Sequence, residues 1–271
     1  MTSFFCRSTA TLLALGGAAL GVGAMSESAL ALSQDIINAQ LNVPVFTLSN
    51  ADGSTLSTSL TNSANEGESV SITHVYISPA DAEAALAEIQ AEAPELAGSY
   101  QVTPIPLSEV YKVAVEQDDE NVIFDFVPIE EEVDYALSLS PALQEQQPGR
   151  VPLFLVSAIQ QPEGATVGDI SENAAENIGR FTLRNGEREV IPMFFKQDQL
   201  TDILEFIAED QPELADSVFV DVIWLENFIS LLANTEDESS GDIQQYRMMP
   251  TAESLTFTVN FSSTLSNDAA E

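Results

Sequence analysis

The order of apolar and polar positions predicts short strands that alternate with helices. Residues 43–48 and 70–77 are short runs rich in β-branched and aromatic side chains, which predict two strands. Asp52-Gly53 lies between them and favours a tight turn. Further strands are expected at residues 102–105 and 122–127.

The helix expected at residues 79–93 has the clearest signals in the chain. Its apolar positions 82, 85, 86 and 89 have the i, i+3, i+4, i+7 spacing of one buried stripe. Ser78 is a suitable N-cap, Pro79 suits the first turn, Asp81 lies near the positive helix end, and Pro94 stops the helix. Shorter helices are expected at residues 107–115 and 130–139. Strands and helices in this order predict an α+β fold.

An internal repeat is the most informative feature of the sequence. Val43-Pro44-Val45-Phe46 recurs as Val151-Pro152-Leu153-Phe154, 108 positions later. Between residues 70 and 114 the best offset becomes 118, which places Pro94-Glu95-Leu96-Ala97 on the identical Pro212-Glu213-Leu214-Ala215. Val127-Pro128 then corresponds to Met249-Pro250 at an offset of 122. We therefore predict two related α+β units, joined either through one continuous sheet or as two lobes.

The chain is expected to divide into four parts. Residues 1–31 read as a signal peptide, 32–149 as the first repeat, 150–257 as the second repeat and 258–271 as a flexible acidic tail. In the first part Arg7 precedes a Gly/Ala/Leu stretch, and Ala29-Leu30-Ala31 is a small-x-small cleavage pattern. The apolar stretch is too short and glycine-rich for a stable membrane span. Cys6 is the single cysteine, so the exported chain would have neither disulfides nor thiol chemistry.

Charge excludes some classes of partner. The chain has 8 Lys and Arg against 43 Asp and Glu, a formal net charge of −35 at pH 7. Such a field repels phosphate, so nucleic acid is excluded as a partner. The few bases cluster at Arg180, Arg184, Arg188 and Lys196, around a hairpin whose strands are expected at residues 181–183 and 189–195, on either side of Asn185-Gly186. They form either a docking spot for an acidic partner or, as we favour, ion pairs with nearby carboxylates.

The sequence offers little for catalysis, metals or cofactors. His74 is the only histidine and falls on an expected strand, which favours a structural role and leaves neither a catalytic triad nor a zinc site. The acidic runs 116–120 and 236–238 lack the EF-hand pattern, and residues 164–168 lack the lysine of a phosphate-binding loop. We therefore expect no cofactor, no metal and no catalytic residue.

Aromatic residues are the better functional lead, although most must belong to the core. Phe194 and Phe195 are adjacent on an expected strand and so point to opposite faces of the sheet. If helices covered only one face, the other face would present an apolar groove for an unfolded segment.

Several motifs together resemble the Tic twenty-two family, named after a 22-kilodalton component of the chloroplast inner-envelope translocon. They cover roughly residues 40–256 and comprise Val43-Pro44-Val45-Phe46 with Asp52-Gly53, Val75-Tyr76-Ile77 with Asp81, Phe126-Val127-Pro128, Val151-Pro152-Leu153-Phe154, Ile191-Pro192-Met193-Phe194-Phe195-Lys196 and Met249-Pro250. The resemblance implies a pseudo-symmetric, butterfly-like α+β fold with a mixed sheet and apolar grooves. The resemblance also gives five candidate residues for these grooves: Phe46, Tyr76, Phe154, Phe194 and Phe195.

The resemblance also implies a soluble protein that escorts precursors between two membranes. Cyanobacterial members are associated with the periplasm and thylakoid region and with outer-membrane biogenesis, alongside the barrel-assembly machinery. A bacterial-type signal replaces a plastid transit peptide here, which indicates a cyanobacterial exported protein in the periplasm or thylakoid lumen. We expect a non-enzymatic, chaperone-like transport factor that binds unfolded precursor or outer-membrane proteins. An adaptor docking on a translocon or barrel-assembly complex is the alternative, and a carboxylate-dependent hydrolase a third.

Overall fold

The computed structural model describes residues 34–61, 69–116, 122–139, 151–159, 178–185, 188–210, 212, 215–233 and 243–268. Other segments singled out above lie outside the described residues: the expected signal peptide with Cys6, the acidic residues 117–120 and 236–238, and residues 164–168.

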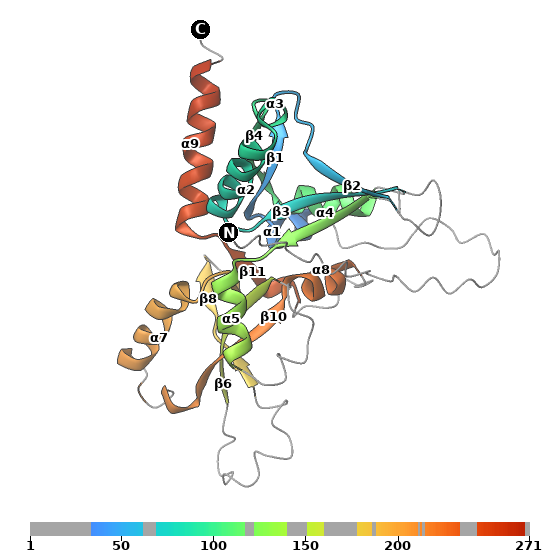
Figure 1. Ribbon diagram of the computed structural model, residues 1–271. Helices are drawn as coiled ribbons and strands as arrows, with labels where there is room; N and C mark the ends of the chain where they lie inside the picture. The colour runs from blue at the N-terminus through green and yellow to red at the C-terminus, as the bar shows by residue number, and fades with distance from the viewer. Residues whose placement is uncertain are drawn as a thin grey trace, which may run out of the picture.

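The first half of the chain forms a five-stranded mixed sheet (Figure 1). Its strands are β1 (Pro44–Asn50), β2 (Ser57–Thr61), β3 (Ser69–Tyr76), β4 (Tyr100–Pro106) and β5 (Val122–Val127). β1 is antiparallel to both β3 and β4, β2 is antiparallel to β3, and β5 is parallel to β3. Phe46 is paired with Tyr76 on one side and with Pro104 on the other.

The local signals in this half act as expected. The helices are α1 (Gln34–Gln40), α2 (Pro79–Glu92), α3 (Pro94–Ala97), α4 (Leu107–Glu116) and α5 (Glu130–Leu139). Ser78 caps α2 by accepting a hydrogen bond from the Ala80 N–H at 3.2 Å. Gly53 makes the turn after β1 with a φ of 81°, a conformation that favours glycine.

The second half forms a sheet with the same order of strands. It contains β6 (Pro152–Ile159), β7 (Ile178–Arg180), β8 (Leu183–Asn185), β9 (Arg188–Phe194), β10 (Val218–Trp224) and β11 (Tyr246–Met249). Its helices are α7 (Asp198–Asp210), α8 (Leu225–Ala233) and α9 (Ala252–Asp268), with 3₁₀ turns η2 (Ala215–Ser217) and η3 (Ile243–Gln245).

The registers of the two sheets correspond residue by residue. Phe154 is paired with Phe194 as Phe46 is with Tyr76, and Phe194 is paired with Met249 as Tyr76 is with Val127. These pairings reproduce the sequence offsets of 108, 118 and 122. The molecule is α+β with two pseudo-symmetric mixed sheets, as the sequence predicted.

Two boundaries differ from the sequence-based expectation. The prediction of a flexible tail from residue 258 was wrong for its described part, because α9 continues as a helix to Asp268. Phe257 and Phe261 lie on this helix, and Phe257 packs against the first sheet. The hairpin strands expected at residues 181–183 and 189–195 are instead β8 and β9, since Leu183 pairs with Val190 and Asn185 with Arg188.

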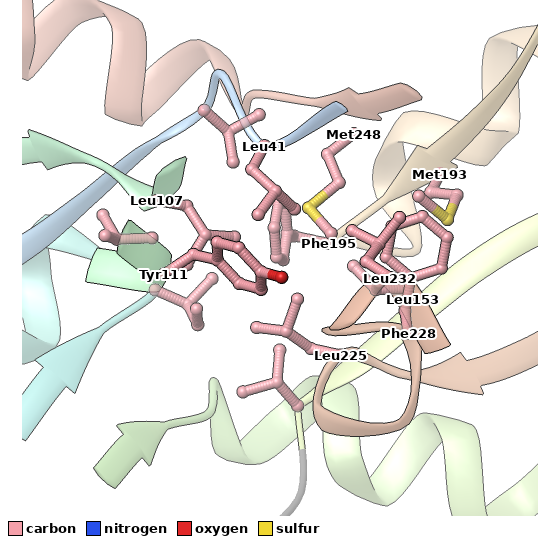
Figure 2. Close-up of a cluster of buried hydrophobic side chains, with 14 of the residues drawn as sticks. Leu41, Leu107, Tyr111, Leu153, Met193, Phe195, Leu225, Phe228, Leu232 and Met248 are labelled. Atoms are coloured by element: carbon pink, nitrogen blue, oxygen red, sulfur yellow. The ribbon is translucent and has the colours of Figure 1, made fainter. Parts of the chain in front are cut away.

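A single apolar core fills the space between the two sheets (Figure 2). Side chains from the facing sides of both sheets meet there, including Val45 and Val75 from the first, and Leu153 and Met193 from the second. α4 and α8 add Leu107, Tyr111, Leu225, Phe228 and Leu232. The halves are therefore neither one continuous sheet nor two lobes with separate interiors.

The outer faces of the sheets are covered by helices exchanged between the halves (Figure 1). α5 belongs to the first half of the chain but packs on the second sheet, where Tyr135 contacts Phe154 with ring centroids 5.4 Å apart. α9 belongs to the second half but packs on the first sheet, where Phe257 meets Phe46 edge-on at 5.2 Å. α2 and α7 complete the two outer layers beside α9 and α5 respectively.

The shared core and exchanged helices predict that both halves unfold together. Trp224 is the only tryptophan and is buried in the second sheet, so its fluorescence reports on that half. Leu48→Ala removes a buried side chain from the apolar cluster on the outer face of the first sheet, which costs about 2–5 kcal/mol. We expect it to lower the urea midpoint of Trp224 fluorescence and of far-UV circular dichroism equally. An unchanged Trp224 midpoint would contradict this expectation.

Glu132 on α5 is a buried carboxylate on the outer face of the second sheet. Its side chain is 2% exposed, and its Oε2 accepts a hydrogen bond from the Gln197 N–H at 2.9 Å. Burial raises the pKa of Glu132, and Glu131 and Asp198 raise it further, against the opposing effects of the hydrogen bond and Lys196. Between the ordinary glutamate pKa and this raised pKa, the folded state binds more protons than the unfolded state. The Glu132 contribution to stability is therefore largest below this window and is lost as pH rises through it.

We expect Glu132→Gln to gain stability relative to the wild type as pH rises through that window, because the amide keeps an acceptor for Gln197 without a charge to bury. Urea unfolding at pH values from about 4 to about 8 measures the difference. Asp134→Asn, at an exposed position of the same helix, removes the same formal charge without changing a group that shifts the Glu132 pKa, and is the control. A stability difference independent of pH would rule out this role of Glu132.

Candidate functional site

All five groove candidates are core residues in the structure. Phe46 and Tyr76 lie on the outer face of the first sheet, and Phe154 and Phe194 on the outer face of the second. Phe195 belongs to the core between the sheets. Each is less than a tenth exposed. They form no exposed groove because helices cover the outer faces and the sheets cover each other's inner faces.

The structure instead has a hollow on the inner face of the first sheet, beside α4. Its volume is about 430 Å³, and its floor consists of hydroxyl side chains on β1, β2 and β3: Thr47, Ser57, Ser71 and Thr73. Its walls are apolar and come from β4, β5 and α4: Ile105, Val110, Val113, Val122 and Phe124. Thr55, Pro106 and Glu109 complete the lining. This volume falls in the usual range for ligand pockets.

Two of the four floor hydroxyls, those of Ser57 and Thr73, are paired across neighbouring strands. Ser57 Oγ lies 2.7 Å from Thr73 Oγ1, and near the floor Ser49 Oγ lies 2.6 Å from Thr103 Oγ1. Since β2 and β1 adjoin neighbouring strands in register, each pair is a cross-strand contact on one face. Each paired hydroxyl has a partner within the sheet, so this part of the floor needs no polar group from a bound segment.

Side-chain size explains why the hollow lies in the first half. Thr47 and Thr73 correspond in the repeat to Leu155 and Ile191, and Val110 corresponds to Phe228. All three larger residues are buried in the shared core. Small side chains thus leave space in the first half at positions that larger ones fill in the second.

The chemistry of the hollow suits binding rather than catalysis. Glu109 is the only acidic residue among those that line it, so it lacks the facing carboxyl pair that a glycosidase requires. Among the described residues, no group of three or more His, Cys, Asp or Glu is placed to hold a metal ion. The apolar walls from β4, β5 and α4 favour apolar side chains of a bound segment.

Among the described residues, the imidazole of His74 contacts the carboxylate of Asp125 at the surface. Its Nδ1 lies 3.0 Å from Asp125 Oδ2, between the parallel strands β3 and β5, and the imidazole is 37% exposed. It lies outside the hollow and has no cysteine or serine nucleophile among its described contacts.

Three of the four clustered bases form ion pairs, as favoured from the sequence. Arg180 pairs with Asp221, Arg184 Nη2 lies 3.6 Å from Glu189 Oε1, and Lys196 Nζ lies 3.9 Å from Glu253 Oε2. These three side chains therefore do not form a free basic surface.

Negative charge surrounds the outer face of the first sheet, opposite the hollow. Burial raises the pKa of Tyr76, and the carboxylates of Asp125, Glu88 and Asp81 raise it further. The pKa of Asp81 is raised by its own burial first and then by Glu253, with an opposing effect of Lys196. This face therefore favours positive charge in anything that binds there.

The internal repeat, rather than the aromatic residues, contains a sequence signal for the hollow. Aligned by the repeat offsets, Thr47 and Thr73 fall where the second unit has Leu155 and Ile191. A hydroxyl-bearing residue at a position where the other unit has a large core residue indicates a sheet face with less apolar side-chain volume.

The fold is that of an α+β protein with two pseudo-symmetric mixed sheets packed around a common core. The chain belongs to the Tic22-like family, whose model matches residues 14–259.

Two solved structures share the fold. Anabaena Tic22, described as a protein of protein transport, matches with a TM-score of 0.65 and 23% identity over 84% of this chain and 97% of its own. Tic22 from Plasmodium falciparum matches with a TM-score of 0.57 and 17% identity over 84% of this chain and 98% of its own. A comparison with curated proteins finds no match. Among the described residues, no helix has the length and apolar character to span a membrane.

Proposed function

We propose that this chain is a chaperone-like transport factor that binds apolar segments of unfolded precursor or outer-membrane proteins between two membranes. The observation that carries the proposal is the hollow beside α4, whose walls are apolar and whose exposed wall residue Val113 is 38% accessible. Family membership supports it, since Anabaena Tic22 is described as acting in protein transport.

The size of the hollow makes the proposed binding weak and reversible. One or two large apolar side chains contribute about 1.5–3 kcal/mol each when buried. Micromolar affinity corresponds to about 8 kcal/mol, so a client held by this contact alone leaves readily. Release then needs no nucleotide, and the net charge of −35 keeps loaded molecules apart.

The proposed compartment follows from the expected signal peptide. An exported protein of this kind works in the periplasm or the thylakoid lumen, where it hands its client to a membrane partner such as a barrel-assembly or translocon component. An adaptor that only docks on such a complex would not bind unfolded chains, which separates the two functions experimentally.

The test measures light scattering from an unfolded outer-membrane β-barrel protein diluted into buffer without ATP, with and without residues 32–271. We expect dose-dependent suppression of aggregation, and we expect Val113→Asp to weaken it because a carboxylate in the apolar wall disfavours apolar occupants.

The matched control is Leu231→Asp. Leu231 occupies the repeat position of Val113 on α8 and is 55% exposed, but it is not among the residues lining the hollow. It should suppress aggregation like the wild type, with circular dichroism confirming that both variants fold. Absence of suppression at a roughly tenfold excess would favour the adaptor, whereas equal loss in both variants would remove the hollow from the proposal.

A further inference from the structure

α9 is fixed to the molecule mainly at its N-terminal end. Thr251 caps it, because its Oγ1 accepts a hydrogen bond from the Ser254 N–H at 3.1 Å, and both residues are buried. Gln199 Nε2 donates to the Pro250 carbonyl at 3.1 Å, and Lys196 pairs with Glu253. These contacts all lie within one turn of the start of the helix.

Beyond this turn, α9 touches the first sheet through a narrow aromatic stripe. Phe257 meets Phe46 edge-on at 5.2 Å, and Phe261 stacks on Phe257 at 6.5 Å. Other large apolar residues of the helix face solvent: Leu255 is 49%, Val259 63% and Leu265 53% exposed. The far end of α9 stands beside α2 and ends at the top of the molecule in Figure 1. Little apolar area therefore holds this helix in place.

The sequence of α9 also makes it a weak helix by itself. Five hydroxyls bond back to carbonyls one turn earlier within the helix: those of Thr256, Thr258, Ser262, Ser263 and Thr264. Serine and threonine have low helix propensity, and such bonds slightly destabilise helices. The last turn contains no basic residue and ends with Asp268, which opposes the helix dipole.

α5, which covers the second sheet at the equivalent place, is held more firmly. It buries three residues against the second sheet: Glu132, Val133 and Ala136. Of the α9 residues 252–265, whose burial is described, Ser254 alone is buried. α9 should therefore detach from the first sheet more easily than α5 detaches from the second.

The face beneath α9 is strongly apolar. Phe46 and Ala82 are fully buried there, with Leu48, Tyr76 and Val102 beside them, and Phe257 packs against this cluster, which we call the outer cluster. If α9 moved away, the outer cluster would form a groove flanked by α2 and surrounded by acidic groups. Because a helix with aromatic residues four positions apart fills this place now, the groove is shaped for a helix of that kind.

We propose that α9 is a displaceable occupant of the outer cluster, and that a helical segment of a client with two large apolar residues four positions apart, flanked by Lys or Arg, replaces it. The identification of that segment as part of a precursor rests on the proposed function. Basic flanks match the carboxylates of Asp81, Glu88, Asp125 and Glu253 around this face. The surface is separate from the hollow beside α4, which lies on the opposite face of the same sheet.

The experiment uses the chain from residue 32 to 271 and a fluorescent peptide of residues 251–268 as the probe. Wild-type α9 is tethered at an effective concentration of about millimolar, so free peptide competes poorly with it. Phe257→Ser with Phe261→Ser in the chain weakens that internal competitor. We expect fluorescence anisotropy to show at least about tenfold tighter binding of the peptide to this variant than to the wild type.

Two controls test the stated chemistry. Leu255→Ser with Val259→Ser in the chain changes the exposed side of α9 and should leave the affinity for the peptide as in the wild type. A peptide with Phe257→Ser and Phe261→Ser should not bind. A peptide with Ser262→Lys and Ser263→Lys should bind more tightly, with the gain lost at high salt. Absence of peptide binding to a folded variant with Phe257→Ser and Phe261→Ser would overturn the proposal. An affinity that does not change with the aromatic or lysine substitutions in the peptide would overturn it as well.

Hydrogen exchange of the wild type gives a second test that needs no variant. The amides of α9 beyond its first turn should exchange through local opening, faster than those of α5. Exchange of α9 only with global unfolding would overturn the proposal. Val113→Asp, added to the variant with Phe257→Ser and Phe261→Ser, should leave peptide binding unchanged. The proposal for the hollow and the proposal that α9 is displaced can therefore fail independently.

Discussion

Both faces of each sheet carry large apolar side chains, and the rest of the architecture follows from the need to cover all four faces. In β1, Val45 points into the space between the sheets and Phe46 points outward, and in β6 Leu153 and Phe154 do the same. The inner faces cover each other, with α4 and α8 filling the gap. The outer faces each need two helices, and in both cases one of the two comes from the other half of the chain.

Pseudo-symmetry in this molecule is close in topology and looser in side-chain volume. Strand order and register are the same in the two sheets, but the inner face of the first has hydroxyls where the second has Leu155 and Ile191. The outer layers differ as well, because α5 buries Glu132, Val133 and Ala136, whereas Ser254 alone is buried among the α9 residues 252–265. Departures from the repeat therefore coincide with the surfaces to which we assign binding.

Local patterns predicted the elements well, because capping, turn and periodicity signals act over a few residues. Ser78, Pro79 and Gly53 have the roles expected of them, and residues 122–127 and 130–139 form the expected strand and helix. The partner of each covering helix was not predictable this way, since the stripe on a helix shows that it is buried but not against which sheet. The five aromatic candidates became core residues for that reason. The hollow was also missed, because it depends on small side chains from several strands meeting on one face.

The exchange of α5 and α9 also bears on how such a fold could exist with one unit per chain. A lone unit would have a sheet with one outer helix missing and an inner face open to water. Two identical chains related by a two-fold axis would supply the missing outer helix and cover the inner face, because the last helix of each would pack on the sheet of the other. The interface between them would be self-complementary. The present chain has the form of such a reciprocally swapped homodimer joined into one polypeptide, which ties the position of each covering helix to a connection that crosses from one half to the other.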